Sequence, residues 1–427
     1  MSYEPEMKEI EIKHVSRVDA EVKIPGSKSY TQRALAIAAL AEGTSFLSNA
    51  LLSGDTERLM SALRDLGAEI MVGDDGITVN GTGGDILNPG REIHLGNNGT
   101  ALRLLISLVA LGRGNYVLTG DGRLRERPVK PLLDALVSMG IRVRSDGGFP
   151  PVIIDAEGMP GGTVALRDIE SSQYVSSLLI SAPYAAKATI VELRGRTPSQ
   201  PYIDMTLETM ESFGVPVVRQ APDRYLIKAG RRYRGKSYRV EGDASSASYF
   251  FSAAAVSGGR IRAEEINPRT LQGDIAFLGI LEQLGCAVVR GNSFVEVEGG
   301  ELRSGDFVFD LGDMPDMVPT LAVLGAVRPG KTVVKNVPHL RFKESNRLEA
   351  LVTELNRVGI RAYETEDGLV IEGGSPRSAA IETYNDHRIA MSFAVLGLVV
   401  PGIRIKDGDC VKKSFPGFWA ELSKLTS

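Results

Sequence analysis

Six times along the chain, a short polar cluster opens an apolar segment rich in small residues, at intervals of about 70 to 74 residues. These segments, for example residues 101–111 and 320–327, are apolar on nearly all sides, which is typical of helices in a protein interior. The pattern therefore predicts six interior helices, each beginning at a polar cluster. The clusters are Ser27-Lys28-Ser29, Asn97-Asn98-Gly99-Thr100, Ser171-Ser172-Gln173, Asp243-Ala244-Ser245-Ser246, Met314-Pro315-Asp316 and Asn385-Asp386-His387-Arg388.

A second motif, Leu-x-x-Leu-Gly followed by a branched residue and a strand-like run, recurs with nearly the same spacing. Its glycines are Gly67, Gly140, Gly214, Gly285 and Gly359. Each glycine predicts the end of a second, amphipathic helix. The unit then reads as polar cluster, helix, strand, second helix and one or two strands. This alternation predicts a mixed α/β (α+β) fold of six repeats.

The first repeat shows the expected elements in detail. A helix over residues 29–40 ends at Gly43, and a strand over 44–52 leads to a second helix over 56–66. Two strands, 70–72 and 77–79, then flank the hairpin signal Gly73-Asp74-Asp75-Gly76.

The sixth repeat is incomplete, because the chain ends within its Leu-x-x-Leu motif at residues 419–425. The alternating stretch 10–22 is the expected donor of the missing strand, which would make the chain circularly permuted. Three repeats in each of two domains is the simplest partition, with a break near the basic run 231–236. We expect one domain at 23–239 and another at 1–22 with 240–427.

Bulk composition limits the classes of function. A chain of 427 residues exceeds the roughly 250–300 residues of a single core. A net charge of −4 gives no reason to expect nucleic acid. Cys286 and Cys410 form no disulfide framework or zinc motif. Residues 1–6 lack a signal-peptide pattern, and no apolar run suggests a membrane span. We expect a cytoplasmic protein without a membrane partner.

The helix starts suggest anion binding. The first turn of a helix has unpaired N–H groups and about half a positive charge. Six starts that converge would therefore bind anions strongly. Cations and carboxylates recur at equivalent points of the repeats, namely Lys28, Arg33, Arg123, Asp316, Lys343, Glu344, Arg347, His387, Arg388, Lys412 and Lys413.

Each of these signals also has a simpler interpretation. Lys28 lacks the upstream glycine of a nucleotide phosphate loop, and it can be an exposed lysine on a capped helix. The basic run around Arg123 can be a solvated loop. Asp316 can be a capping residue, and His387 can be structural. The four-residue spacing of Lys343 and Arg347 also fits a helix surface.

Taken together and in order, the motifs resemble the 5-enolpyruvylshikimate-3-phosphate (EPSP) synthase family of enolpyruvyl transferases. The resemblance runs essentially end to end. It rests on Pro25-Gly26-Ser27-Lys28-Ser29 with Arg33, Leu95-Gly96-Asn97-Asn98-Gly99-Thr100 with Arg103, Arg123 before Glu126-Arg127-Pro128, Ser171-Ser172-Gln173, Pro201-Tyr202-Ile203-Asp204, Gly242-Asp243-Ala244-Ser245-Ser246, Pro315-Asp316, Lys343-Glu344-Ser345-Asn346-Arg347, Asn385-Asp386-His387-Arg388 and Lys413-Ser414-Phe415-Pro416.

The resemblance implies two lobes, each an inside-out α/β barrel of three βαβαββ repeats, with helix starts facing a cleft. It also implies transfer of the enolpyruvyl group of phosphoenolpyruvate to the 5-hydroxyl of shikimate-3-phosphate, with release of phosphate, on the route to chorismate and aromatic amino acids. No metal, cofactor or nucleic acid is implied, and a monomer is expected.

The family's site residues carry over by position. Shikimate-3-phosphate is expected at Lys28, Ser29, Arg33, Ser171, Ser172, Gln173, Tyr202, Asp316, His339 and Lys343. Phosphoenolpyruvate is expected at Lys28, Asn97, Gly99, Arg123, Gln173, Arg347, Arg388 and Lys413. The expected catalytic residues are Lys28, Asp316, Glu344 and His387, with Glu344 as proton donor and Asp316 as acceptor. The chain departs from the family at His339, often Asn, at Asn98, often Ala, and at Asn346, often Asp.

Two alternatives remain at this point. The sister enzyme that acts on UDP-N-acetylglucosamine typically carries a reactive cysteine, whereas residues 23–239 have no cysteine and Lys28 is followed by Ser29 instead of Asn. The second alternative is a non-catalytic protein that binds a phosphorylated metabolite. The presence of both Asp316 and Glu344 beside the cations argues against it.

Overall fold

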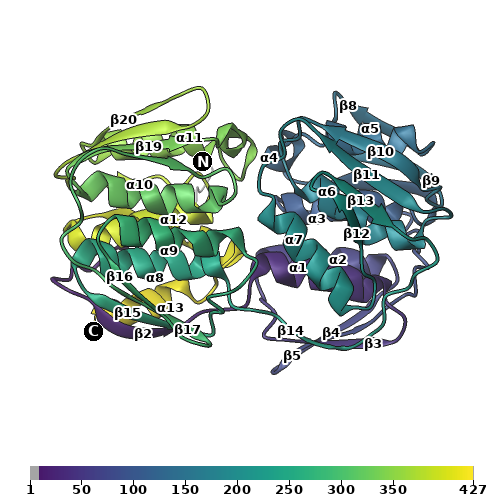
Figure 1. Cartoon of the computed structure of the whole chain (residues 1–427), viewed down its shortest axis with the longest axis horizontal. Helices are drawn as coiled ribbons and strands as arrows, with labels where there is room; N and C mark the ends of the chain where they lie inside the picture. The colour runs from purple at the N-terminus through teal and green to yellow at the C-terminus, as the bar shows by residue number, and fades with distance from the viewer. Residues whose placement is uncertain (1–8, 427) are drawn as a thin grey trace, which may run out of the picture. The chain divides into compact units, whose positions relative to one another are not determined.

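The computed structural model describes residues 9–426. Residues 1–6, which lack the pattern of a signal peptide, lie outside this range. The chain divides into two compact units, which are described separately (Figure 1). The central unit is Gly26–Glu241, and the terminal unit combines Met1–Pro25 with Gly242–Ser427.

Three four-stranded sheets of one topology form the strands of the central unit. In each sheet, the first two strands are parallel and a hairpin pairs antiparallel with the second strand. The sheets, in strand order, are β14 (Ser237–Arg239), β3 (Thr44–Ser48), β5 (Gly76–Asn80) and β4 (Glu69–Gly73); β6 (Ile93–His94), β7 (Arg113–Thr119), β9 (Phe149–Glu157) and β8 (Arg142–Asp146); and β10 (Gly162–Arg167), β11 (Thr189–Arg194), β13 (Arg224–Ile227) and β12 (Val218–Ala221).

The terminal unit repeats the same topology, with a smaller third sheet. Its sheets, in strand order, are β2 (Asp19–Lys23), β15 (Arg260–Glu264), β17 (Phe294–Glu298) and β16 (Ala287–Arg290); β18 (Phe307–Asp310), β19 (Gly330–Lys335), β21 (Leu369–Gly373) and β20 (Arg361–Glu364); and β22 (Ala380–Ile381), β23 (Arg404–Ile405) and β1 (Ile10–Glu11). The six βαβαββ repeats expected from the sequence are therefore present.

The N-terminal segment completes the sixth repeat, as predicted. β1 pairs antiparallel with β23, which is the position that a hairpin strand occupies in the other five sheets. The expectation of one strand over 10–22 is wrong, however. The backbone N–H groups of Ile12 and Val15 donate to Ile403 and Leu398 instead of to a neighbouring strand. The chain then forms β2, which belongs to the fourth repeat.

Six interior helices pack together in threes, as their apolar composition predicts. In the central unit α3 packs against α1 and α6, and in the terminal unit α8, α10 and α12 pack against one another. Figure 1 shows α10 and α12 between the sheet of β19 and β20 and that of β15 and β17. The six helices are α1 (Lys28–Leu40), α3 (Gly99–Val109), α6 (Gln173–Ser181), α8 (Ala244–Ser257), α10 (Val318–Val327) and α12 (His387–Val399).

The polar clusters lie where these interior helices begin. Ser27, Asn98, Asp243 and Asp386 are N-caps whose side chains accept a backbone N–H of the first turn. Such caps explain why a polar cluster precedes these four apolar runs, because the first N–H groups of a helix need acceptors. The cluster at 314–316 differs, since a short 3-10 turn, Pro315–Met317, separates it from α10.

Each repeat has a second helix, and in four repeats this helix contacts a hairpin strand of its own sheet. After five of these second helices, the glycine of the Leu-Gly motif adopts a φ of 85° to 106°, a conformation that glycine reaches without strain. The predicted helix ends are therefore correct. These helices are α2 (Gly54–Asp65), α5 (Lys130–Ser138), α7 (Pro201–Ser212), α9 (Phe277–Gln283), α11 (Arg347–Arg357) and α13 (Phe418–Ser423).

The strand predicted over residues 44–52 ends at Ser48. Asn49 has a φ of 53°, which breaks the extended backbone. The N–H of Leu51 then donates to the hydroxyl of Thr31 on α1, at 3.0 Å. This bend brings the start of α2 close to the start of α1. No helix within residues 9–426 is long and apolar enough to cross a membrane.

Candidate active site

In the central unit, side chains link the first turns of α1, α3 and α6 to one another. Every pair of these helices shares at least one direct hydrogen bond near the polar starts. The bonds are Asn98 Nδ2 to Gln32 Oε1 at 3.0 Å, Gln173 Nε2 to Thr100 Oγ1 at 2.9 Å, and Arg33 Nη2 to Ser176 Oγ at 3.2 Å. The three helix starts expected to bind anions are therefore gathered in one place within this unit.

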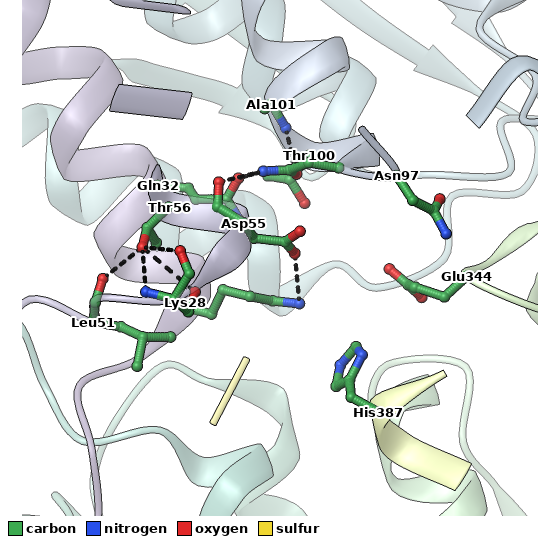
Figure 2. Close-up of polar contacts among 12 residues, drawn as sticks. Lys28, Gln32, Leu51, Asp55, Thr56, Asn97, Thr100, Ala101, Glu344 and His387 are labelled. Carbon is green, nitrogen blue, oxygen red and sulfur yellow. Dashed lines mark hydrogen bonds and ion pairs between the residues drawn. The ribbon is translucent and has the colours of Figure 1, made fainter. Parts of the chain in front are cut away.

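Lys28 is the first residue of α1, and its ammonium group lies 3.3 Å from Asp55 Oδ2 (Figure 2). Both side chains are largely buried, at 12% and 5% exposed. Asp55 lies in the first turn of α2, which begins with a capping box between Ser53 and Thr56. Lys28 was predicted as a site residue from the sequence, whereas Asp55 was not.

Arg33 is buried at the junction of α1, α6 and α7. Four of its N–H groups donate to protein acceptors, namely the Thr206 hydroxyl, the Ser29 carbonyl, the Ser176 hydroxyl and the Tyr202 carbonyl. Its guanidinium also lies 5.7 Å from the centre of the Tyr202 ring. Burial lowers the pKa of Arg33 to about 10. Three expected shikimate-3-phosphate residues, Ser29, Arg33 and Tyr202, are thus neighbours.

The start of α3 places Asn97 and Gly99 beside the buried Arg127. A Cβ atom on Gly99 would lie 2.5 Å from the guanidinium carbon of Arg127, so only glycine permits this close approach. Arg123 lies in the short helix α4 (Gly122–Arg125). Its side chain is 29% exposed, and the guanidinium pairs with Glu126 at 2.8 Å.

Gln173, the first residue of α6, is fixed by α3. Its side-chain oxygen accepts from Arg103 at 2.8 Å, and its amide nitrogen donates to Thr100. The preceding hydroxyl of Ser171 accepts from the Gln173 backbone N–H at 3.3 Å. Ser171 and Ser172 are both buried at this helix start.

In the terminal unit, Arg347 is the centre of a buried charge cluster. It is 1% exposed and pairs with Asp316 at 2.8 Å, with Glu344 at 2.6 Å and with Asp386 at 2.8 Å. Burial alone would lower the pKa of Arg347, but the three carboxylates outweigh burial and raise it. The charge cluster brings together three expected site residues of the fifth repeat, Asp316, Glu344 and Arg347, and joins them to Asp386 of the sixth.

Arg388 extends this cluster to α8. It pairs with the second carboxylate oxygen of Asp316 at 2.6 Å and donates to the Tyr249 hydroxyl at 3.2 Å. Burial raises the pKa of Tyr249 to about 12, against the opposing effect of Arg388, so this hydroxyl stays protonated at neutral pH. Asp316 therefore holds two arginines with its two oxygens, which a capping role alone would not explain.

The other expected residues of the terminal unit lie on three separate elements. His387 is fully buried at the first position of α12, with Nδ1 3.9 Å from Asp386. His339 is buried in a 3-10 helix, Pro338–Phe342, and Lys343 follows that helix directly. Lys413 ends another 3-10 helix, Gly408–Lys413. Within residues 9–426, no group of three or more His, Cys, Asp or Glu side chains is arranged to hold a metal ion.

Asp274 is a buried carboxyl group that was not predicted from the sequence. Burial raises its pKa to about 7, and the charge of Asp316 adds to the shift whereas Arg388 opposes it. Its Oδ2 accepts a hydrogen bond from the hydroxyl of Ser245. In the sequence it lies directly before the apolar run 275–281, which does not distinguish it from a surface residue.

Asp274 is expected to make the terminal unit less stable as pH rises. A folded pKa above the unfolded value of 3.8 contributes stability that is complete below pH 3.8 and is lost as pH rises through about 7. Asp274→Asn removes this titration and keeps an acceptor for Ser245. We expect the variant to gain stability over the wild type at pH 8, and to gain less at pH 5. Urea unfolding at each pH, followed by the fluorescence of Trp419, the one tryptophan of the chain, measures the two differences in stability. An equal gain at the two pH values contradicts the expectation.

Comparison with known proteins gives one consistent result. The family model described as EPSP synthase (3-phosphoshikimate 1-carboxyvinyltransferase) matches residues 12–422. The chain is 45% identical over 412 residues to the 3-phosphoshikimate 1-carboxyvinyltransferase of Trichormus variabilis, covering 96% of each chain. It is 44% identical over 424 residues to that of Nostoc punctiforme, covering 98% and 99%. A solved EPSP synthase from Acinetobacter baumannii superposes with a TM-score of 0.81 at 28% identity, covering 98% of both chains.

Proposed function

The chain belongs to the EPSP synthase (3-phosphoshikimate 1-carboxyvinyltransferase) family, and from this premise we propose how its residues transfer the enolpyruvyl group of phosphoenolpyruvate to shikimate-3-phosphate. The observation that carries the proposal is the gathering of helix starts and cations in each unit. Both substrates are anionic, so their mutual repulsion must be offset by positive charge. Helix starts, lysines and arginines provide that charge.

Shikimate-3-phosphate is assigned mainly to the central unit. Its phosphate matches the paired hydroxyls at the start of α6 and the neighbouring cations, and Tyr202 with Arg33 flanks the ring. The set is Lys28, Ser29, Arg33, Ser171, Ser172, Gln173 and Tyr202, to which the terminal unit adds Asp316, His339 and Lys343. Support comes from the shared junction of Ser29, Arg33 and Tyr202.

Phosphoenolpyruvate is assigned to cations of both units. Arg123, Arg347, Arg388, Lys28 and Lys413 supply charge for its phosphate and carboxylate, since guanidinium groups bind such anions bidentately. Asn97, Gly99 and Gln173 contribute from the starts of α3 and α6. The close approach of Gly99 to Arg127 supports this assignment, because it places a cation directly beside the start of α3.

The reaction needs one proton donor and one proton acceptor. The 5-hydroxyl adds to the central carbon of phosphoenolpyruvate while Glu344 delivers a proton to the methylene carbon. Asp316 takes the hydroxyl proton, and Lys28 and His387 assist. The product is a tetrahedral ketal phosphate. Loss of phosphate, together with a proton from the new methyl group, restores the double bond.

We also propose that the two units are the functional domains expected at 23–239 and at 1–22 with 240–427. The division of internal contacts between Pro25 and Gly26, and between Glu241 and Gly242, supports this. A monomer in the cytoplasm is the expected form. Sedimentation of the purified chain as a single species of monomer mass tests the first point.

Phosphate release tests the proposed activity. We expect inorganic phosphate to appear only when phosphoenolpyruvate and shikimate-3-phosphate are both present. UDP-N-acetylglucosamine in place of shikimate-3-phosphate should give none. Binding of shikimate-3-phosphate without any turnover would contradict the enzyme assignment and favour a non-catalytic binding protein.

Lys28→Met tests the central unit's contribution. The substitution keeps a side chain of similar length and removes the charge, so we expect kcat/KM to fall at least about 100-fold, as for loss of a charged group in a water-excluded site. Steady-state phosphate release measures the change, with Lys130→Met as the control. Lys130 pairs with Asp134 on an exposed helix turn, and its loss should change kcat/KM less than twofold. Comparable rates for the two variants would contradict the role of Lys28.

A further inference from the structure

Asn98 turns its side chain into the protein, although its backbone directly precedes Gly99. The side chain is buried and makes three hydrogen bonds. Its oxygen accepts from the N–H of Ala101 at 2.9 Å, and its amide nitrogen donates to the backbone oxygen of Asp55 at 2.7 Å and to Gln32 Oε1 at 3.0 Å. One side chain therefore connects α1, α2 and α3.

The orientation of the Gln32 side chain depends on its hydrogen bond with Asn98. The amide nitrogen of Gln32 is buried and has no hydrogen-bond partner within residues 9–426. Its oxygen, by contrast, accepts from Asn98. A buried amide with one anchored end is held by that end alone, so Asn98 fixes the orientation of Gln32 as well.

Asp55 is held from two sides. On one side is the capping box of α2, in which the Thr56 hydroxyl accepts from the Ser53 N–H at 2.9 Å and donates to the Leu51 carbonyl at 2.8 Å. On the other side, the side-chain amide nitrogen of Asn98 donates to the Asp55 backbone oxygen. The carboxylate of Asp55 then meets the ammonium group of Lys28.

We propose that Asn98 is a positioning residue, which fixes Asp55 so that Asp55 holds the Lys28 ammonium group at the place where the substrate is bound. The proposal rests on the proposed function, in which Lys28 contacts both substrates. A misplacement of about 1 Å in a positioned group is enough to lower a rate by about 100-fold. Asn98 acts through Asp55 and touches no substrate with its side chain.

Two substitutions separate positioning from helix capping. Asn98→Ser keeps a hydroxyl that accepts from the first turn of α3 and loses the amide donor, whereas Asn98→Ala loses both. We expect kcat/KM for phosphoenolpyruvate to fall about 10-fold in each variant, as for a shift of well under 1 Å. We expect the thermal midpoint to be lower in Asn98→Ala than in Asn98→Ser.

Ser177→Ala is the control for a general loss of stability. Ser177 joins α6 to α3 through the Ser107 hydroxyl at 2.7 Å, deep in the central unit. Its removal should lower the thermal midpoint while kcat/KM stays within twofold of the wild type. If the kcat/KM of Asn98→Ser also stays within twofold of the wild-type value, then Asn98 acts only as a helix cap and the proposal is overturned.

Combination with Asp55→Asn tests whether Asn98 acts through Asp55. Asp55→Asn removes the charge that holds Lys28. In that background we expect Asn98→Ser to lower kcat/KM less than twofold further, because residues that act in one chain of contacts are not additive. A further 10-fold loss would show that Asn98 acts independently of Asp55 and would overturn the proposal.

A readout without turnover keeps this inference separate from the proposed function. An ammonium group held by a carboxylate is a poor nucleophile, so loosening Asp55 should speed acetylation of Lys28. We expect at least threefold faster labelling by N-hydroxysuccinimidyl acetate in Asn98→Ser, and an unchanged rate in Ser177→Ala, by peptide mass spectrometry. Unchanged labelling in Asn98→Ser overturns the inference. A wild type that labels as expected but never releases phosphate overturns only the proposed function.

Discussion

Glu344→Gln is expected to lower kcat by about 100- to 10,000-fold, the range that a positioned acid or base contributes. Glutamine has nearly the shape of glutamate, and its side-chain oxygen still accepts from Arg347, which lies 2.6 Å from Glu344 in the wild type. The charge cluster therefore keeps its form while the proton donor is lost. Steady-state phosphate release gives kcat, and calorimetric titration should give a dissociation constant for shikimate-3-phosphate within about threefold of the wild type, since the lost group acts on the transferred proton.

Glu349→Gln is the matched control for this prediction. Glu349 lies one turn further on, in the first turn of α11, and is exposed. Its amide variant should leave kcat within twofold. A Glu344→Gln enzyme that retains more than about a fifth of the wild-type kcat would place the proton donor elsewhere, with Asp316 the next candidate because it faces both Arg347 and Arg388.

The interior helices were predictable because each is an apolar run, and at four of them a second, independent signal coincides with it. An apolar run with no polar face indicates burial, and a capping residue marks its first turn. Asn98 and Asp386 show both, and the helices begin where expected. The terminal repeat was predictable for a different reason, since a broken period implies a missing strand, which β1 supplies.

The short strands at the chain crossings were not predictable. β14 has three residues, Ser237–Arg239, which are too few to show a periodic pattern. It joins the first sheet only because β3 presents an open edge to it. The stretch 10–22 alternates at its two ends but not at Lys13-His14 and Ser16-Arg17, and its middle bonds to residues near the end of α12 and beyond it. In both places, contacts with distant parts of the chain determine the pairing, and the local sequence pattern does not indicate these contacts.

The site residues divide in the same way. Lys28, Gln173 and Arg388 lie at helix starts, so their clustering within each unit follows from the repeat. The positions of their interaction partners do not follow from the repeat. Asp55 begins a second helix and Tyr249 lies in the middle of α8, and nothing in the local sequence indicates that these side chains meet a lysine and an arginine. Such partners become visible only when the packing of three helices is known.

Asp386→Ala is expected to destabilise the terminal unit by about 3–5 kcal/mol, because it leaves the buried Arg347 without its most enclosed partner. The Asp386 carboxylate is fully buried and accepts from Arg347 Nε at 2.8 Å, from the Ser345 hydroxyl at 3.0 Å and from the Arg388 N–H at 3.0 Å. Asp386→Asn keeps the helix cap and one acceptor, so it should lose less stability.

Asn346→Ala is the control. Asn346 caps α11 with a side chain outside the buried core, so this variant should lose only about 1 kcal/mol of stability. Urea unfolding at pH 7, followed by Trp419 fluorescence, reports on this unit. Equal losses for Asp386→Ala and Asn346→Ala would show that Asp386 serves as a cap alone, and that the charge of Arg347 is balanced by Asp316 and Glu344 without it.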